Sequence, residues 1–375
     1  MTSPPNETGD SPLAPYDGIL LMSFGGPEGP EDVMPFLRNV TAGRGIPDER
    51  LAAVAEHYQR FGGKSPINDQ NRALLGALRT ELDRRGISAP LLWGNRNFDP
   101  FVTSTLREAH DAGLRRVVAI VTSAYSSYSS CRQYREDLAA AALTLADEGR
   151  DIEIDKVRPY FNHPGFSRVN ARQVTEAVRA LGQRTDSEVR LVFVTHSISE
   201  GMDATSGPGD GEGSAYQRQH VELAAAITGE LNATLSRRLD YELVYCSRSG
   251  PPSQPWLEPD INEALRRLAG EGVRTVVVAP IGFISDHMEV RFDLDTEAAQ
   301  TAAALGLEMV RVPTVGTDPE FVSGLVDLAL ERAAQARGAA GAVPTWPGSE
   351  AFPPVCRPGC CPNLRAATPA LCGSD

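Results

Sequence analysis

Apolar, β-branched runs that alternate with helical patterns are the feature that most constrains the fold of this chain. Strands are predicted at 18–24, 90–95, 115–124, 152–160, 189–197, 241–249, 274–283 and 307–314. Helices are predicted at 68–85, 100–112, 132–147, 166–182, 213–232, 258–270, 286–304 and 318–337. Nearly continuous apolar strands separated by helices are typical of parallel sheets covered on both faces, so we expect an α/β fold.

The length of 375 residues and the eight predicted strands favour two doubly wound halves over a single sheet. The last predicted helix is rich in Ala and Leu, and we expect it to pack back across both halves. The expected division is a disordered leader (1–15), a first parallel-sheet domain (16–170), a second one (171–317), the returning helix (318–337), and a Gly/Pro-rich linker with a cysteine-rich tail (338–375).

Charge and hydropathy exclude several classes of protein. A net charge of −13 disfavours nucleic acid and anionic membranes as partners, because both require basic surfaces. No run approaches the ~20 apolar residues of a membrane span. The polar, Pro-rich start lacks the basic and apolar regions of a secretory signal. We therefore expect a cytoplasmic protein.

Two predicted strands end in residues that can bind metal or move protons, and ligand sites in such sheets lie beyond the carboxyl ends of strands. His196 ends one strand, and the run "TVVVAP" leads into "GFISDHMEVRFDLD". If an α-helix starts at Asp286, its carboxylate shares one face with those of Glu289, Asp293 and Glu297, and no lysine follows at i+4.

Such a row attracts cations, and mutual repulsion raises some of its pKa values. Imidazole with carboxylate suits iron, zinc, manganese or cobalt. We expect His196 and Glu289 to be donated by different halves and to face each other across a cleft. The alternatives are a strand-end histidine bonded only to backbone and a solvated acidic helix face. A nucleotide site after the first strand is disfavoured, since "SFGGPEGPEDV" is not a dinucleotide or P-loop motif.

The cysteines are unevenly placed, with four in the last twenty residues (Cys356, Cys360, Cys361 and Cys372) and Cys131 within the fold. In a reducing compartment such clustering suggests metal more than disulfides. The spacing C-x₃-C-C-x₁₀-C fits a zinc ribbon poorly. A disordered tail with reactive thiols is the alternative.

Seven motifs, taken in order, resemble those of the ferrochelatases, in the actinobacterial form that carries a cysteine tail. They are "LLMSFGGPEGPEDVMPFL", "HYQRFGGKSPIN", "SAYSSYSSCRQY", "RPYFNHPGF", "VFVTHSIS", "SRSGPPSQPWLEP" and "PIGFISDHMEVRFDLD", and they span most of residues 18–337. The resemblance implies a chelatase-like fold with two Rossmann-like halves around a porphyrin cleft. It also implies a reaction, the insertion of Fe²⁺ as substrate into a porphyrin with release of two protons.

The resemblance also implies roles for individual residues. His196 and Glu289 match the catalytic metal site, and Asp293 and Glu297 match the acidic relay that leads away from it. Phe24 stands where some relatives have an iron-ligating tyrosine, and a phenyl ring has no lone pair to offer. The positions that match porphyrin contacts are Ser65 and Tyr134. For the tail, the resemblance implies a 2Fe–2S cluster held by Cys131 and three tail cysteines, with one of Cys360 and Cys361 to spare.

Substrate identity is inferred from a polar segment. Relatives that take protoporphyrin IX often have a hydrophobic lip, whereas residues 61–82 here are polar. This favours coproporphyrin III as substrate and coproheme as product. We also expect a monomeric enzyme, with a coproheme decarboxylase as the downstream partner. Four basic residues near the first-half loops are candidates to meet propionates: Arg38, Arg44, Lys64 and Arg72. The remaining alternatives are a protoporphyrin IX ferrochelatase, a cobalt chelatase, and a non-catalytic haem- or iron-binding sensor.

Overall fold

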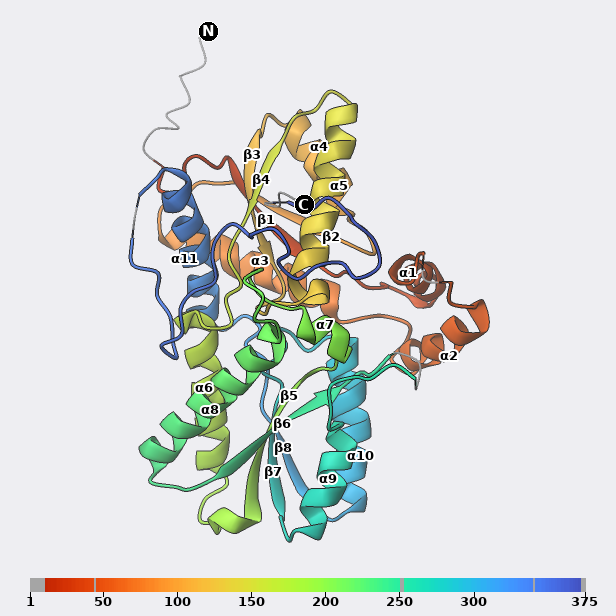
Figure 1. Cartoon of the computed structure of the whole chain (residues 1–375), viewed down its shortest axis with the longest axis vertical. Coiled ribbons are helices and arrows are strands. Elements are labelled where there is room, and N and C mark those ends of the chain that lie inside the picture. Colours follow the sequence, from red (N-terminus) through yellow and green to blue (C-terminus); the bar gives the residue numbers. More distant parts are fainter. Residues whose placement is uncertain (1–10, 44, 250–252, 340, 372–375) are drawn as a thin grey trace.

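The computed structural model describes residues 11–43, 45–249, 253–339 and 341–371, and it contains two four-stranded parallel sheets (Figure 1). The first sheet has the order β2-β1-β3-β4, and the second has the order β6-β5-β7-β8. The strands are β1 (Gly18–Ser23), β2 (Leu91–Asn95), β3 (Arg116–Val121), β4 (Glu153–Lys156), β5 (Val189–His196), β6 (Asp240–Cys246), β7 (Thr275–Ala279) and β8 (Glu308–Arg311). The eight predicted strands and the two-sheet α/β fold are confirmed.

The central strands are buried on both faces, which explains why they appear in the sequence as unbroken apolar runs. β1 and β7 are buried at every position, and so are the last five residues of β3. Seven predicted helices are confirmed with small shifts at their ends: α3 (Ile67–Arg84), α4 (Val102–Asp111), α5 (Gln133–Asp147), α6 (Pro164–Ala180), α8 (Ala215–Leu235), α9 (Ile261–Gly270) and α11 (Pro319–Ala336).

Three further α-helices are present: α1 (Val33–Val40), α2 (Asp48–Gln59) and α7 (Glu200–Ala204). α1 and α2 pack on each other around a small core of Val33, Phe36, Leu37, Leu51 and Ala55. They project from one side of the first half (Figure 1). Only Leu51 and Ala55 of α2 are buried, so its apolar pattern is too sparse to be recognised from sequence.

The last helix contacts elements on both sides of the domain boundary. α11 packs on α3 and β3 of the first half and also on α6. Across this contact Arg85 Nη1 lies 2.6 Å from Asp327 Oδ1, and Arg158 is paired with Glu331 at 2.9 Å. The expected domain boundary at 170/171 falls inside α6, which packs against α8 and β7 of the second half. We therefore propose a boundary just before Pro164.

Both ends of the described chain are packed against the fold. Leu13 is buried, and Arg337 donates to the carbonyl of Pro12, so the leader does not extend to residue 15 as expected; residues 1–10 lie outside the described residues. The linker docks on the first half, where Arg158 donates to Pro344 O at 3.0 Å. The tail then crosses the first half towards α7 (Figure 1).

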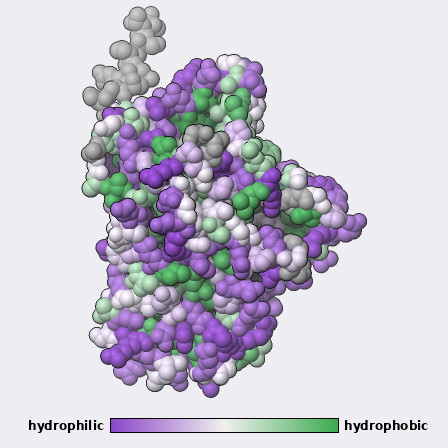
Figure 2. Space-filling model, in the orientation of Figure 1, coloured by the Kyte–Doolittle hydropathy of each residue, from purple (hydrophilic) through white to green (hydrophobic). Residues whose placement is uncertain are grey.

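Within the described residues, no helix is both long enough and apolar enough to cross a bilayer. Figure 2 shows a face made mainly of hydrophilic residues, with hydrophobic ones in small separate groups.

Candidate active site

His196 is the last residue of β5, at the point where the second sheet changes its winding direction. β5 pairs with β6 on one side and with β7 on the other. The connection after β5 leads to β6, whereas the connection after β7 leads to β8 in the opposite direction, so the winding direction changes between β5 and β7. In doubly wound sheets this switch point is where ligands bind. The side chain of His196 is about a third exposed, at 31%. The fold therefore places an accessible imidazole where a ligand is expected.

The contacts of His196 define which ring nitrogen is available. Nδ1 lies within hydrogen-bond distance of the Ser197 carbonyl, which can only accept, so Nδ1 carries the proton of the neutral ring. Nε2 keeps its lone pair and lies 3.8 Å from Glu289 Oε2. Tyr216 supports the strand end by donating its hydroxyl to the His196 carbonyl at 2.8 Å. Nε2 can therefore accept a proton or donate to a metal ion.

A close backbone approach brings the loop after β7 to His196. The N–H of Gly282 donates to the carbonyl of Val194 at 3.1 Å. A Cβ on Gly282 would lie 2.1 Å from Thr195 Oγ1, so only glycine fits at this position. This contact directs the following residues past the end of β5, and Glu289 arrives beside His196.

The expectation that different halves donate these two residues is wrong. Both residues belong to the half that contains the second sheet, because His196 ends β5 and Glu289 lies in the segment that follows β7. The first half contributes α2 instead. His57 stacks on Phe292 with ring centroids 4.1 Å apart, and Tyr58 is close enough that burial and then the charge of Glu289 raise its pKa. Neither residue was identified from the sequence, because α2 was not.

The segment that carries the acids differs from the predicted α-helix over 286–304. Helical structure begins at Met288, continues as a π-helix, η4 (Val290–Ala298), and becomes α-helical only in α10 (Ala299–Ala304). The N–H of Ala299 bonds the carbonyl of Leu294, the i→i+5 pattern of a π-helix. Long π-helical segments are rare and frequently occur at functional sites. The 100° spacing assumed for these acids therefore does not apply.

The acids also do not form one unpaired row. Asp286 and Asp295 are both paired with Arg311, at 2.6 and 2.9 Å, so the prediction that Asp286 shares an unanswered acidic face is wrong. Arg311 follows Asp295 by 16 residues and Asp286 by 25, so a comparison of neighbours at i+4 does not reveal these ion pairs. Among the residues that the structure describes, no arginine pairs with Glu289, Asp293 or the exposed Glu297.

Asp293 is the most perturbed of these acids. Burial raises its pKa to about 6, a hydrogen bond from Ser247 opposes that rise, and the nearby charge of Glu289 adds to it. Ser247 follows β6 and has a φ of +61°, which an L-residue adopts only under local constraint. The sequence analysis did not single out Ser247, although "SRSGPP" directly follows a strand end at this edge. His287 is a further neighbour, since Glu289 lies 4.0 Å from its Nδ1.

The predicted porphyrin contacts lie on the side of the first sheet. Ser65 and Tyr134 are both buried. The guanidinium of Arg96 lies 4.7 Å from the ring centroid of Tyr134 and 5.7 Å from that of Phe24, and it is paired with Asp137. Arg96, which the sequence analysis missed, therefore joins the residue after β1 to the start of α5.

The cations expected to meet propionates are already paired with acids. Arg44 lies outside the described residues. The pairs are Arg38 with Asp48 at 2.6 Å, Lys64 with Asp69 at 2.6 Å, and Arg72 with Glu28 at 2.6 Å. A propionate at any of these positions would have to compete with a carboxylate.

Four of the cysteines that the structure describes lie together, whereas Cys246 is buried apart from them at the end of β6. Hydrogen bonds link the thiol of Cys131 to that of Cys356, Cys356 to Cys360, and Cys360 to Cys361. Cys361 Sγ also contacts the carbonyl of Gly207 at 3.5 Å. Cys372 lies outside the described residues.

The hydrogen bond with Cys356, together with burial, raises the pKa of the Cys131 thiol well above its usual value. Within the described part of the chain, no three His, Cys, Asp or Glu side chains gather in a group able to hold a metal ion. The thiols thus contact one another in successive pairs.

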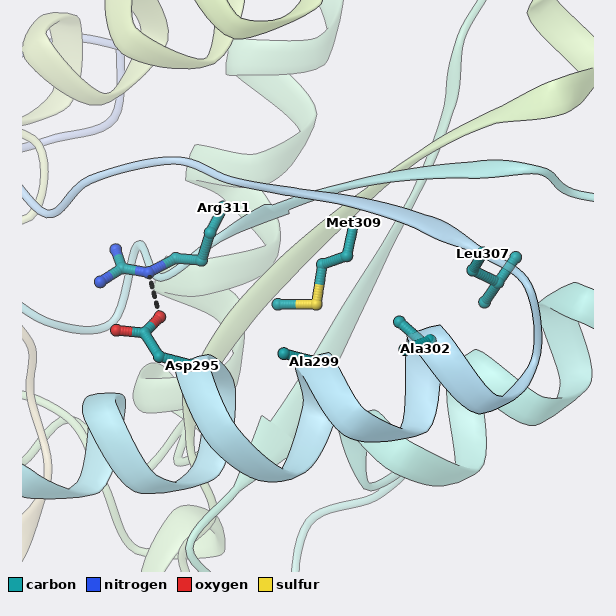
Figure 3. Close-up of a pocket in the computed structure, with 7 residues that line it drawn as sticks. Asp295, Ala299, Ala302, Leu307, Met309 and Arg311 are labelled. Carbon is teal, nitrogen blue, oxygen red and sulfur yellow. Dashed lines mark hydrogen bonds and ion pairs between the residues drawn. The ribbon is translucent and has the colours of Figure 1, made fainter.

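Two pockets lie near the site, but neither is lined by His196 or Glu289. One, of about 370 Å³, lies between η4–α10 and β8, where Ala299 and Ala302 face Met309 beside the pair of Asp295 and Arg311 (Figure 3). The other, of about 210 Å³, lies between α3 and the loops after β7 and β8. Neither pocket is the tetrapyrrole cleft that was expected beside His196 and Glu289.

Comparison with known proteins identifies the family. The family model described as Ferrochelatase matches residues 16–333. A protein named coproporphyrin III ferrochelatase from Leifsonia xyli subsp. xyli is 51% identical, covering 96% of this chain and 94% of its own length. A protein of the same name from Streptomyces griseus subsp. griseus is 50% identical, covering 96% of this chain and 97% of its own. A solved structure of SirB from Bacillus subtilis with Fe³⁺ is similar at 12% identity and a TM-score of 0.49, covering 86% of this chain and 97% of that one. The chain belongs to the Ferrochelatase family.

Proposed function

We propose that this protein inserts Fe²⁺ into coproporphyrin III, giving Fe-coproporphyrin III (coproheme) and two protons, as a step of haem biosynthesis. Family membership and the names of relatives about 50% identical support the reaction and the porphyrin. The structural observation that carries the proposal is the 3.8 Å separation of His196 Nε2 and Glu289 Oε2 at the switch point of the second sheet. The lone pair of His196 Nε2 and the carboxylate of Glu289 are therefore close enough to act on the same ion or proton.

His196 is proposed as the base of the reaction. A free porphyrin holds two N–H protons, and both must leave as Fe²⁺ takes the four nitrogens. Nε2 of the neutral imidazole is unprotonated and accepts the first proton, the role that a positioned histidine has in general acid–base catalysis. Glu289 stabilises the imidazolium that forms, because its carboxylate is the nearest negative charge to Nε2. Two side chains make only an incomplete metal site, which suits an ion that must be handed to the porphyrin.

The carboxylates beyond Glu289 are proposed as the relay. Glu297 is exposed, and Asp293 lies between it and Glu289 along η4. Negative side chains in this order attract Fe²⁺ from solvent towards Glu289. Because burial raises the pKa of Asp293 to about 6, this group also exchanges protons near neutral pH. The relay can thus serve ion entry and proton exit.

Ser65 and Tyr134 are proposed to contact the porphyrin from the side of the first sheet. Contacts remote from the metal supply the binding energy that bends the ring and exposes its nitrogen lone pairs. Arg96 holds Tyr134 in place, because its guanidinium lies over the ring and is itself tied to Asp137. The polar lip and the relatives' names favour the tetracarboxylate coproporphyrin III over protoporphyrin IX.

We also propose that the cysteine tail holds a 2Fe–2S cluster. Thiolates are the usual ligands of such clusters, and the thiols of Cys131, Cys356 and Cys360 lie close to one another. Cys131, Cys356 and Cys360 are the favoured ligands, with Cys372 as the fourth, because Cys361 is instead engaged with Gly207. A bound cluster supplies a cross-link between tail and fold and a one-electron redox couple.

Contacts that hold the tail against the first half support this proposal. Arg135 donates to the carbonyl of Cys360 at 3.2 Å and to that of Leu371 at 3.1 Å, and Arg132 donates to Thr368 O at 3.0 Å. The raised thiol pKa values mean that binding of a cluster would release protons.

The described cysteines are free thiols rather than disulfides, which favours the reducing cytoplasm as the working compartment. The product still carries the four propionates of its substrate, so we propose a coproheme decarboxylase as the partner that takes it from a monomeric enzyme. The deciding experiment compares turnover of coproporphyrin III and protoporphyrin IX with Fe²⁺ under anaerobic conditions. Faster metallation of coproporphyrin III supports the proposal, faster metallation of protoporphyrin IX overturns the porphyrin assignment, and binding of both without metallation favours a sensor.

A further inference from the structure

Arg311, at the end of β8, uses all three of its side-chain nitrogens within one small region. Nη2 lies 2.6 Å from Asp286 Oδ1, Nε lies 2.9 Å from Asp295 Oδ1, and Nη1 donates to the carbonyl of Val312 at 2.7 Å. The side chain is only 18% exposed. These charge-assisted bonds are partly shielded from solvent, so they are stronger than ordinary surface pairs. Figure 3 shows Arg311 reaching from β8 to Asp295 on the helix.

The two acids that Arg311 binds lie on either side of the proposed catalytic segment. Asp286 comes three residues before Glu289, and Asp295 comes two residues after Asp293. One guanidinium, fixed on a strand of the sheet, therefore holds both ends of the stretch that contains Glu289 and Asp293. The planar fork of arginine is suited to this, whereas a lysine ammonium is a single point charge.

This stretch has physical reasons to need such support. Its backbone is π-helical over Val290–Ala298, a form that rarely persists for long without outside constraint. Five carboxylates lie within residues 286–297, and their mutual repulsion opposes a compact arrangement. By neutralising Asp286 and Asp295, Arg311 separates two structural acids from the acids of the relay.

A second anchor comes from the other half of the molecule. Gln70, in α3, donates its amide to the backbone carbonyl of Asp286 at 2.7 Å. Gln70 lies five residues after Ser65, the proposed porphyrin contact. Asp286 is thus held through its side chain by the second sheet and through its backbone by the first half.

We propose that Arg311 is a positioning residue for iron insertion, which keeps Glu289 opposed to His196 by binding Asp286 and Asp295 on either side of it. This inference rests on the proposed function. Arg311 touches neither the porphyrin nor the iron in this scheme. Its loss should therefore affect the handling of Fe²⁺ and leave porphyrin binding intact.

The test compares Arg311→Met and Arg311→Lys with a matched control, Arg184→Met. Arg184 is paired with Glu308 at the opposite end of the same strand, at 2.7 Å. For Arg311→Met we expect kcat/KM for Fe²⁺ to fall about 10- to 100-fold, the usual effect of losing an outer-shell partner. Porphyrin affinity, measured by fluorescence quenching, should stay at the wild-type value. Arg311→Lys should recover part of the loss, and Arg184→Met should match wild type.

Hydrogen exchange gives a readout that does not depend on turnover. Amides of residues 287–298 should exchange faster in Arg311→Met than in wild type or Arg184→Met, while the rest of the second sheet is unchanged. The inference is overturned if these amides are as protected as in the control. It is also overturned if the folded Arg311→Met enzyme keeps the wild-type kcat/KM for Fe²⁺. If wild type itself fails to metallate the porphyrin, the proposed function fails, and the exchange data still decide whether Arg311 holds the segment.

A double variant identifies the route of the effect. Because Asp295→Asn removes one of the two ion pairs made by Arg311, adding it to Arg311→Met should cause little further loss. Losses that multiply would mean that Arg311 acts independently of Asp295 and would contradict the proposed route.

Discussion

His196 Nε2 lies 3.8 Å from Glu289 Oε2, although His196 ends one strand of the second sheet (β5) and Glu289 follows another (β7). The Nδ1 contact with the Ser197 carbonyl leaves Nε2 as the acceptor, and the close packing of Gly282 on Thr195 brings Glu289 to it.

Removing this imidazole should abolish catalysis while sparing substrate binding. We expect His196→Ala to slow Fe²⁺ insertion by about 100- to 10,000-fold, the range over which a general base contributes. Porphyrin affinity, measured by fluorescence quenching, should be retained, because the proposed porphyrin contacts lie on the first-sheet side. His110→Ala, in α4 of the first half, is the matched control. A His196→Ala enzyme that binds porphyrin poorly but turns over what it binds would contradict the assigned role.

Asp293 should make the protein less stable as the pH rises. Because burial raises its folded-state pKa from 3.8 to about 6, the folded state binds more protons than the unfolded state between those values. Stability attributable to this group is therefore present at low pH and is lost as the pH rises through about 6. Asp293→Asn should stabilise the protein at pH 7 by about 3 kcal/mol, given ~1.4 kcal/mol per pKa unit.

Urea denaturation at pH 4.5 and pH 7 measures this difference, with Glu297→Gln at the exposed end of the row as control. An equal effect of Asp293→Asn at both pH values would show that Asp293 is not perturbed by burial.

Buried histidines should have the opposite effect on the acid side. Burial lowers the pKa of His220 to about 3 and that of His163 to about 4. The unfolded state therefore binds more protons below pH 6.5, and stability is lost as the pH falls. Each imidazole should account for about 2 kcal/mol lost between pH 6.5 and pH 5. His220→Gln, which can still bond Thr195, should flatten the pH dependence of the free energy of unfolding, and an unchanged slope would argue against this linkage.

Much of this site follows from simple rules on the sequence. Runs rich in apolar and β-branched residues predicted all eight strands, and the rule that ligands bind at carboxyl ends of strands pointed to His196 and to the residues that follow β7. Three features could not be predicted. The π-helix replaces the assumed 100° periodicity, and α2 buries too few residues to show a pattern. Arg311 reaches its acids through sheet pairing of β7 with β8, which no local spacing reveals.

The thiol contacts predict which cysteines matter. Cys360 is linked to both Cys356 and Cys361, whereas Cys361 also contacts Gly207. We therefore expect Cys131→Ser, Cys356→Ser, Cys360→Ser and Cys372→Ser to remove the visible absorbance of a 2Fe–2S cluster. Cys361→Ser should retain it. Iron and sulfide analysis of each purified variant provides the check, and a colourless wild-type protein reconstituted anaerobically would contradict the cluster itself.

The most direct test of the central claim is an anaerobic stopped-flow measurement with Fe²⁺ and coproporphyrin III, recording porphyrin absorbance and proton release together. We predict that wild type converts free porphyrin to its iron form with two protons released per turnover, and that His196→Ala and Glu289→Gln bind the porphyrin but convert it far more slowly. Conversion at the wild-type rate by both variants, or porphyrin binding by wild type without conversion, would contradict the account.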